Sequence, residues 1–158
     1  MISFEDFAPG QVRQLGSVVV DRDEMVTFAR RFDPQPFHLD EEAGKASIFG
    51  RLAASGWFTA GLWMRLYTDA ILLRSDALGS PGGDEIAWPA PVFAGDELFA
   101  SMEVIETRRS ASKPWMGLVT LRAWMRRGAP DSDGTDSDDV VYRARFTGMY
   151  GSREQPRP

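Results

Sequence analysis

A nearly uncharged run of residues, 52–64, limits the folds open to this chain more than any other segment. Arg51 and Arg65 bracket the run, which is too short to cross a bilayer, since a spanning helix needs about 20 apolar residues. Its composition predicts a helix from Gly56 to about Leu73 that is apolar on nearly every side. Other elements of the fold must therefore enclose this helix.

The second half of the chain has the alternating pattern of half-buried strands. Apolar and polar residues alternate over three segments, 98–105, 118–125 and 140–150. A further strand is expected before them, over 85–91. Turn residues at 94–96 and 109–114 separate neighbouring segments. One long apolar helix accompanied by antiparallel strands predicts an α+β fold in which a sheet wraps around the helix.

The first part of the chain predicts a strand, a capped helix and a loop. Residues 14–20 have β character, and Asp21 then caps a helix with Glu24 in the capping-box position. The buried stripe expected on this helix consists of Met25, Phe28, Ala29 and Phe32. The helix must end by Asp33, because Pro34 disfavours helical geometry in the preceding residue. Residues 33–49 are expected to be mostly loop, with a short helical turn near Glu41.

Length and composition predict one globular domain over residues 1–158. The net charge of −5 and the lack of a dense basic stripe argue against a nucleic-acid partner. The chain has no cysteine, which excludes disulfides, thiolate metal sites and a cysteine nucleophile and fits a reducing cytoplasm. The N-terminus lacks the layout of a signal peptide, so we expect a cytoplasmic protein that does not associate with membranes.

The acidic segment between Gly128 and Asp139 predicts a solvated hairpin loop, because its residues cannot bury enough apolar surface to fold. Its aspartates could offer oxygen ligands to calcium. However, the segment lacks the final bidentate Glu of an EF-hand loop, and strands rather than helices flank it. We therefore expect no metal site there.

His38 is the only histidine in the chain, and it lies in a segment, residues 33–40, that two prolines stiffen. An aspartate and a histidine can share general acid–base work when burial and proximity tune their pKa values. Asp33 and His38 are the candidates for this pair. Their spacing alone fits equally an ordinary packing histidine beside prolines that end a helix.

A second candidate feature precedes the apolar helix. Small residues occupy 53–56, with Ser55 available as the N-cap of the helix. The start of a helix presents unpaired N–H groups and a positive dipole end, which can hold a thioester carbonyl as it becomes an enolate. Gly56 would let a ligand approach the backbone closely. Taken alone, this segment fits simple helix capping.

Together, the segments Asp33-Pro34-Gln35-Pro36-Phe37-His38-Leu39-Asp40 and Ala54-Ser55-Gly56 resemble the MaoC-like acyl dehydratases, which include the (R)-specific enoyl-CoA hydratases. The family motif has the form Asp-x-Asn-Pro-x-His-x-Asp, followed by a His-Gly or Ser-Gly step at the start of the central helix. Residues 4–10 and 88–96 resemble the start of the family and its strand–turn-Gly-Asp hairpin, so the resemblance covers nearly the whole chain.

The resemblance implies a hot-dog fold, a curved antiparallel sheet around a long central helix. It also implies reversible addition of water to a trans-2-enoyl thioester, carried by CoA or an acyl carrier, as in fatty acid metabolism. Asp33 and His38 would then be the catalytic pair, and Gly56 with Ser55 would receive the substrate carbonyl. Further substrate-binding candidates are Gln35, Pro36, Trp57 and Phe58. No metal or redox cofactor is expected, because the thioester itself makes the β-carbon electrophilic.

The chain departs from the family at two positions. Gln35 replaces the usual Asn, and Met64 stands where some hydratases have a serine on the central helix. A hot-dog thioesterase, or a non-catalytic subunit that binds acyl thioesters, remains an alternative. The resemblance also implies a homodimer or a dimer of dimers, with edge-to-edge pairing of sheets. Arg108, Arg109 and Lys113 could contact CoA phosphates or form a solvated charged turn.

Overall fold

A computed structural model describes residues 1–128 and 139–155 of the chain. The acidic segment for which we predict a hairpin loop falls almost entirely outside these residues. The helices are α1 (Arg22–Phe32), α2 (Pro36–Leu39), α3 (Glu41–Ala46) and α4 (Gly56–Ala70), with short 3₁₀ turns η1 (Phe4–Asp6) and η2 (Leu72–Arg74). The strands are β1 (Val12–Val19), β2 (Ala77–Ala87), β3 (Glu97–Arg109), β4 (Met116–Arg127) and β5 (Val140–Gly151).

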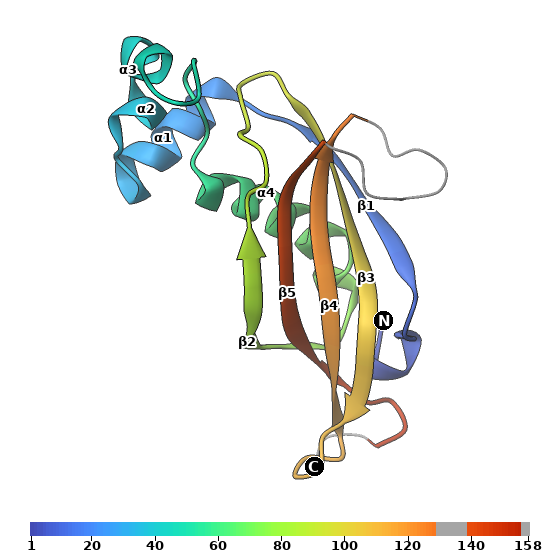
Figure 1. Cartoon of the computed structure of the whole chain (residues 1–158). Helices are drawn as coiled ribbons and strands as arrows, with labels where there is room; N and C mark the ends of the chain where they lie inside the picture. Colours follow the sequence, from blue (N-terminus) through green and yellow to red (C-terminus); the bar gives the residue numbers. More distant parts are fainter. Residues whose placement is uncertain (129–138, 156–158) are drawn as a thin grey trace.

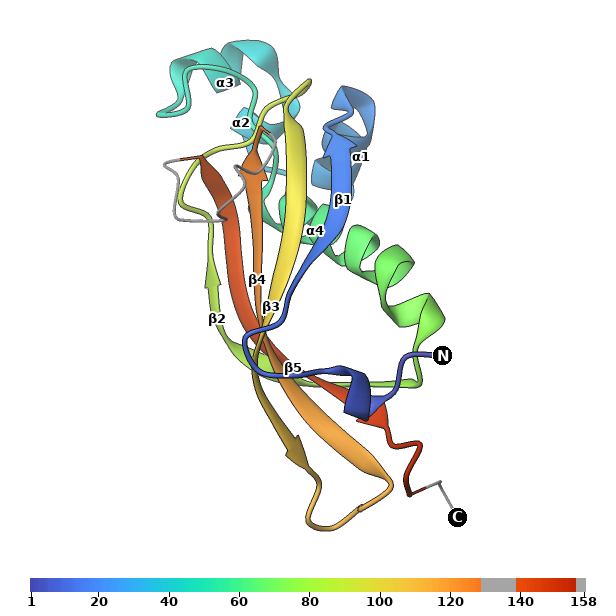
Figure 2. The same cartoon turned by 90° about the vertical axis from the view of Figure 1, so that its right-hand side faces the viewer.

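The five strands form one antiparallel sheet in the order β1-β3-β4-β5-β2. The sheet curves, and α4 lies across its concave side (Figures 1 and 2). The helices α1, α2 and α3 gather at one end of the molecule, beyond the start of α4 (Figure 1). This arrangement confirms the predicted α+β fold, in which a sheet wraps around a long apolar helix.

The buried side of α4 anchors the core. Trp63 is 1% exposed and its indole N–H donates a hydrogen bond to the Ser101 carbonyl of β3, with 3.0 Å between nitrogen and oxygen. Tyr67 stacks on Trp63, and its hydroxyl hydrogen-bonds to the buried hydroxyl of Tyr150 on β5. Because each buried polar group has a partner, the helix can be fixed against the sheet without an unpaired polar group at these contacts.

The prediction that other elements enclose the apolar helix fails on one side of α4 within this chain. Trp57 is 56% exposed and Met64 is 47% exposed, and both lie on the side of α4 that the sheet does not cover. A single curved sheet covers one side of a helix. The sequence pattern predicts that the apolar residues on the other side of α4 belong to the core, but in the single chain they are exposed to solvent.

Two further predictions need correction. The strand expected over 85–91 is β2, which begins at Ala77 and ends at Ala87, because the prolines at 89 and 91 cannot donate ladder hydrogen bonds. Its glycine-rich first part, with positive φ at Gly79 and Gly82, hides the alternation that marks a strand. Residues 33–49 contain two short helices, since Pro36 begins α2 and the Asp40 side chain caps α3.

The first helix agrees with its prediction at both ends. The Asp21 carboxylate caps α1 by accepting the N–H groups of Asp23 and Glu24, and the helix ends at Phe32. Its buried side includes Met25 and Ala29 as expected, whereas Phe32 is 61% exposed because it lies at the end of the helix. Among the described residues, no helix has the length and apolar character that a membrane crossing requires.

Candidate active site

Asp33 takes its position from the end of α1. Its N–H still donates to the Ala29 carbonyl, but its own backbone has left the helical region, with φ −150° and ψ 65°. Pro34 enforces this change, because its ring clashes with a helical residue before it. The side chain of Asp33, 20% exposed, consequently turns toward the segment that precedes α4.

His38 is fixed from two sides although it lies on a helix of four residues. Its Nδ1 lies 2.7 Å from the carbonyl oxygen of Ala53, while the N–H of Ala53 donates to the Phe37 carbonyl at 3.2 Å. A carbonyl can only accept, so Nδ1 carries a hydrogen and Nε2 of the neutral ring has a free lone pair. The imidazole is 5% exposed, and its Nε2 lies 3.5 Å from Oδ2 of Asp33.

Two neighbours hold the Asp33 carboxylate. The Ser55 hydroxyl donates to Oδ2 at 2.7 Å, and the Gln35 amide donates to Oδ1 at 2.8 Å. The hydrogen bond from Ser55 is the main cause that holds the pKa of Asp33 below its ordinary value, against the opposing effect of burial. The Gln35 amide lowers this pKa further, as does the positive charge of the His38 ring when it is protonated. Asp33 is therefore an anion at neutral pH.

The start of α4 completes the arrangement. The Ser55 oxygen also accepts the N–H of Trp57 at 3.2 Å, so one hydroxyl caps the helix and orients Asp33. Gly56 begins the helix, where N–H groups have no partner within the helix. A β-carbon at position 56 would lie 2.7 Å from the Trp88 indole, so the close packing of Trp88 requires glycine there.

These groups border a cavity of about 470 Å³. Its lining comes from the α1–α2 region, the start of α4 and the chain that follows β2: Asp33, Gln35, Phe37, His38, Phe49, Ala54, Gly56, Trp57, Thr59, Trp88, Pro89, Ala90, Pro91 and Val92. The structure thus brings five candidate residues together at one cavity: Asp33, Gln35, His38, Gly56 and Trp57. An acid–base pair next to unpaired helix N–H groups can add or remove water beside a carbonyl.

Three other candidates lie outside the lining of this cavity. Ser55 is fully buried and bonded to Asp33, and Phe58 is buried with its ring 5.6 Å from that of Phe28. Pro36 begins α2 and is absent from the lining. The sequence interpretation missed the wall formed by residues 88–92. The prolines on both sides of Ala90 were a signal, since the same pattern around Gln35 indicated a rigid loop.

The basic residues proposed for CoA phosphates lie at the far end of the sheet. Arg109 closes β3 there, opposite the end that carries α1, α2 and α3 (Figure 1). Its guanidinium is 2.9 Å from the Glu154 carboxylate and 3.4 Å from that of Glu5. Within one chain, Arg109 therefore forms ion pairs with the N-terminal and C-terminal segments and lies far from the cavity.

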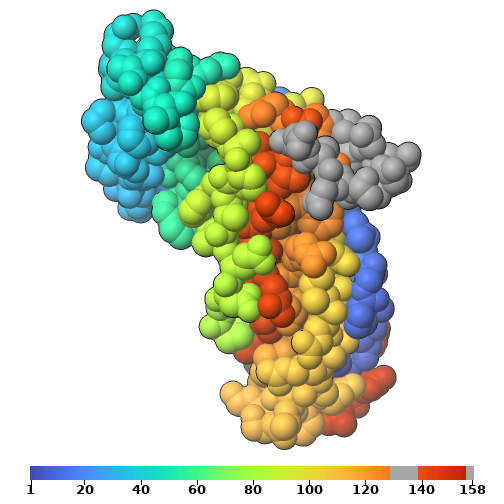
Figure 3. All heavy atoms as spheres, viewed as in Figure 1, coloured from blue at the N-terminus to red at the C-terminus, as the bar shows by residue number. Residues whose placement is uncertain are grey.

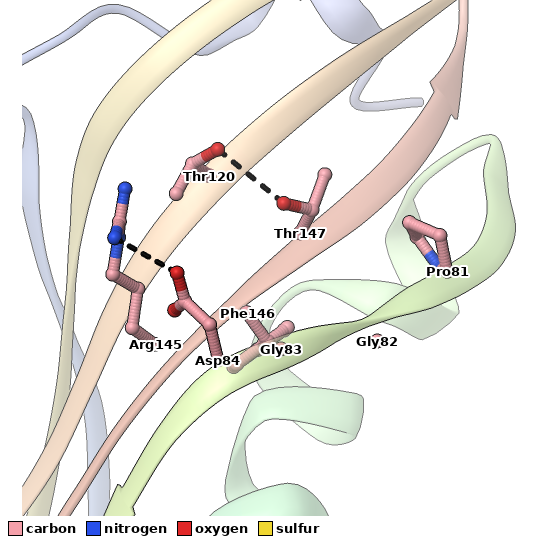
Figure 4. Close-up of a pocket in the computed structure, with 8 residues that line it drawn as sticks. All are labelled: Pro81, Gly82, Gly83, Asp84, Thr120, Arg145, Phe146 and Thr147. Carbon is pink, nitrogen blue, oxygen red and sulfur yellow. Dashed lines mark hydrogen bonds and ion pairs between the residues drawn. The ribbon is translucent and has the colours of Figure 1, made fainter.

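A second hollow, of about 310 Å³, lies over β2 and β5 (Figure 4). Asp84 and Arg145 form an ion pair across it at 3.0 Å, and the hydroxyls of Thr120 and Thr147 are 3.4 Å apart. Its charged groups neutralise each other, and the single histidine of the chain lies in the other cavity. Of these two cavities, only the first therefore contains an aspartate and a histidine side by side.

Comparison with known proteins places this arrangement in a family. The family described as "MaoC like domain" matches residues 6–123. A MaoC-like dehydratase from Rhodospirillum rubrum is 34% identical, with a TM-score of 0.82 over 100% of this chain and 99% of that chain. An (R)-hydratase from A. caviae is 23% identical, with a TM-score of 0.66 over 94% of this chain and 99% of that chain.

A conserved hypothetical protein from Mycobacterium tuberculosis, described as having a double hot-dog fold, is 19% identical, with a TM-score of 0.74. It covers 99% of this chain, which spans only 46% of that protein. The similarity shows the fold, and this chain corresponds to one hot-dog unit. The match over residues 6–123 and the full-length similarity to a dehydratase confirm the predicted resemblance. The chain belongs to the MaoC-like dehydratase family.

Proposed function

We propose that this protein adds water reversibly to a trans-2-enoyl thioester and yields a 3-hydroxyacyl thioester. The observation that carries the proposal is the Asp33–His38 pair, with 3.5 Å between Oδ2 and Nε2, at a largely apolar cavity beside the start of α4. The 34% identical relative is described as a dehydratase, which supports this reaction class. Membership of the MaoC-like family supports a hydratase or dehydratase activity. The choice of substrate is our proposal.

In this proposal, each group at the cavity has a role. The Asp33 carboxylate and the free lone pair of His38 Nε2 are both acceptors, so together they can hold the two hydrogens of one water molecule. The water oxygen bonds to the β-carbon while the pair accepts one of its protons. The electrons of the carbon–carbon double bond move toward the carbonyl, which gains enolate character.

The N–H of Gly56 would stabilise that enolate oxygen, since it lies at the positive end of α4. The accepted proton then returns to the α-carbon. His38 suits this transfer better than Asp33, because hydrogen bonds from Ser55 and Gln35 stabilise Asp33 as an anion. The thioester makes the β-carbon electrophilic, so the proposed reaction needs no metal or redox cofactor. CoA or an acyl carrier would supply the thioester.

We also propose that two copies of the chain pair as a homodimer, or as a dimer of dimers. The strand β2 is one edge of the sheet, and most of its residues are exposed along the near face of the molecule (Figure 3). Exposed Trp57 and Met64 lie on the uncovered side of α4. An open edge and an apolar surface favour association. The double hot-dog relative, about twice as long, supports a paired unit.

The test is the absorbance of the enoyl thioester when purified protein is mixed with crotonyl-CoA. We expect the signal to fall, and we expect Asp33→Asn and His38→Ala to reduce kcat at least about 100-fold, in the range of general acid–base contributions. Because the His38 side chain is buried, His38→Ala removes packing contacts, so circular dichroism of each variant serves as the folding control.

Each other result indicates a different function. Release of free CoA would identify a thioesterase and contradict the hydro-lyase proposal. Binding of acyl-CoA without turnover of crotonyl-, longer or branched enoyl-CoA would identify a non-catalytic binding subunit. Turnover that survives both substitutions would show that the reaction occurs elsewhere on the protein.

A further inference from the structure

The charge of the cavity lining restricts the acyl group that it can hold. Among the lining residues that the structure describes, only Asp33 and His38 are ionisable, and none is a lysine or an arginine. The nearby Arg51 stacks over the Phe93 ring at 4.4 Å, and Arg127 pairs with Asp96 at 3.0 Å. An acyl chain that ends in a carboxylate would lose its hydration in this cavity and would lie near the Asp33 anion with no cation to pair with. Binding of such a chain is therefore unfavourable.

Trp88 forms the wall of the cavity against the start of α4. Its indole lies so close to Gly56 that it occupies the space of a β-carbon there, at 2.7 Å. The Trp57 ring meets it edge to face, with 5.1 Å between centroids. With Trp57, Trp88 is therefore one of the two bulkiest side chains of the lining, and it packs directly on the helix start that would hold the carbonyl of the proposed substrate.

The backbone that follows Trp88 is restrained. Directly after Trp88, the chain passes through Pro89, Ala90 and Pro91, and prolines restrict backbone freedom. The Arg127 guanidinium donates to the Pro91 carbonyl at 2.7 Å, and the N–H of Ala54 donates to the Val92 carbonyl at 2.8 Å. The backbone just after Trp88 is therefore fixed from β4 and from the segment before α4, while the side chain of Trp88, 38% exposed, is placed by its packing on Gly56 and Trp57.

We infer that the cavity accepts an uncharged, apolar acyl chain and that Trp88 limits the length of this chain. The inference rests on the proposed function for its reaction, but it concerns the acyl group alone. Burial against aromatic and aliphatic residues stabilises a bound apolar chain, whereas the indole of Trp88 occupies the space that additional methylene groups would need. Chain length and charge are therefore selected by different features of one cavity.

Kinetics with three substrates test both parts of the inference. Crotonyl-CoA is the short neutral substrate, trans-2-octenoyl-CoA the long one, and fumaryl-CoA the short one that ends in a carboxylate. We expect kcat/KM for fumaryl-CoA to be at least about tenfold below that for crotonyl-CoA. In Trp88→Leu, the octenoyl-to-crotonyl ratio of kcat/KM should rise at least about tenfold, the lower end of what one methylene contributes in an apolar pocket.

Trp115→Leu is the matched control, because Trp115 lies near the β3–β4 turn under the Lys113 ammonium and outside the cavity lining. It should leave both ratios unchanged. An unchanged octenoyl-to-crotonyl ratio in Trp88→Leu would overturn the role of Trp88. Equal kcat/KM values for fumaryl-CoA and crotonyl-CoA would overturn the charge selection.

Binding of unreactive thioesters separates this inference from the proposed function. Calorimetric Kd values for butyryl-, octanoyl- and succinyl-CoA require no turnover. We expect butyryl-CoA to bind more tightly than succinyl-CoA, and Trp88→Leu to improve octanoyl-CoA relative to butyryl-CoA about tenfold. If no enoyl thioester reacts but these binding ratios are observed, the proposed reaction is wrong and the inferred acyl-chain selectivity of the cavity is supported. If turnover occurs without these ratios, the pocket assignment is wrong.

Discussion

At the scale of single residues, the candidate site depends on how one carboxylate is held. Asp33 receives hydrogen bonds on both oxygens, from Ser55 and from Gln35, and both lower its pKa. In the proposed mechanism, the Asp33 carboxylate must be ionised to accept a hydrogen bond from the water. A lowered pKa therefore keeps Asp33 able to hold the water at pH values well into the acidic range.

The first prediction concerns Ser55→Ala. Loss of the hydroxyl removes the main cause of the lowered pKa, so the pKa of Asp33 should rise and the acidic limb of kcat/KM should move to higher pH. Activity should fall most at low pH and recover as the pH rises. The pH dependence of kcat/KM for crotonyl-CoA measures this shift, and Gln35→Ala should cause a smaller one.

The control for Ser55→Ala must separate this effect from loss of a helix cap, which costs about 1 kcal/mol. Asp21→Ala removes the cap of α1, at a residue outside the cavity lining. It should lower the thermal unfolding midpoint and leave the acidic limb in place. An acidic limb that does not move in Ser55→Ala would contradict the assigned role of the hydroxyl.

At the scale of elements, the site is a junction between α4 and the loop after β2. Trp88 packs on the first residue of α4, and the Val92 carbonyl accepts a hydrogen bond from Ala54 just before that helix. The junction therefore places the helix start and the cavity wall relative to each other. Substitutions on the two elements should therefore have non-additive effects on activity.

The second prediction uses this junction. In Gly56→Ala, the new β-carbon would lie 2.7 Å from the Trp88 indole, so the ring or the helix start must move. We expect kcat/KM to fall about tenfold or more, because the helix start would hold the substrate carbonyl less well. Adding Trp88→Leu to Gly56→Ala should restore part of the loss, since the smaller side chain gives space for the β-carbon.

Measurement of kcat/KM for the wild type, both single variants and the double variant gives the coupling between the two positions. Losses that simply multiply, with no recovery in the double variant, would mean that Trp88 does not confine position 56. Far-UV circular dichroism of each variant verifies that α4 is retained.

At the scale of the whole molecule, the sheet leaves two kinds of surface open. The edge strand β2 offers backbone groups, and α4 offers Trp57 and Met64. Both surfaces lie outside the core that the sheet and the buried side of α4 form together. A second copy of the chain would cover them, as the proposed homodimer requires.

The third prediction tests that pairing. The wild type should sediment with the mass of two or four chains, and Met64→Glu should shift it toward the mass of one, because a charge would be buried in the interface. Ile48→Glu is the matched control, since Ile48 is 96% exposed and lies after α3 rather than on α4. A wild type that sediments as a single chain at micromolar concentration would contradict the pairing.

Sequence patterns predicted the elements well where local rules decide. Asp21 and Ser55 act as helix caps, and α1 ends before Asp33 because of Pro34, all of which are short-range effects. Strands β3, β4 and β5 lie where the alternation predicts them. The prediction was wrong for β2, because glycines and register shifts conceal its pattern, and for the enclosure of α4, because burial depends on what the sheet covers.

The sequence by itself predicted the α+β fold class through helix periodicity and strand alternation. Its motifs carried the family resemblance and made the Asp33–His38 pair the catalytic candidates, because these patterns are all local. Only the tertiary structure decided that Ser55 orients Asp33 from 22 positions away, that Ala53 fixes the tautomer of His38, and that Trp88 lies on Gly56. Such contacts join segments distant in the chain. Their distances follow from how the sheet and helices pack, which no local pattern encodes.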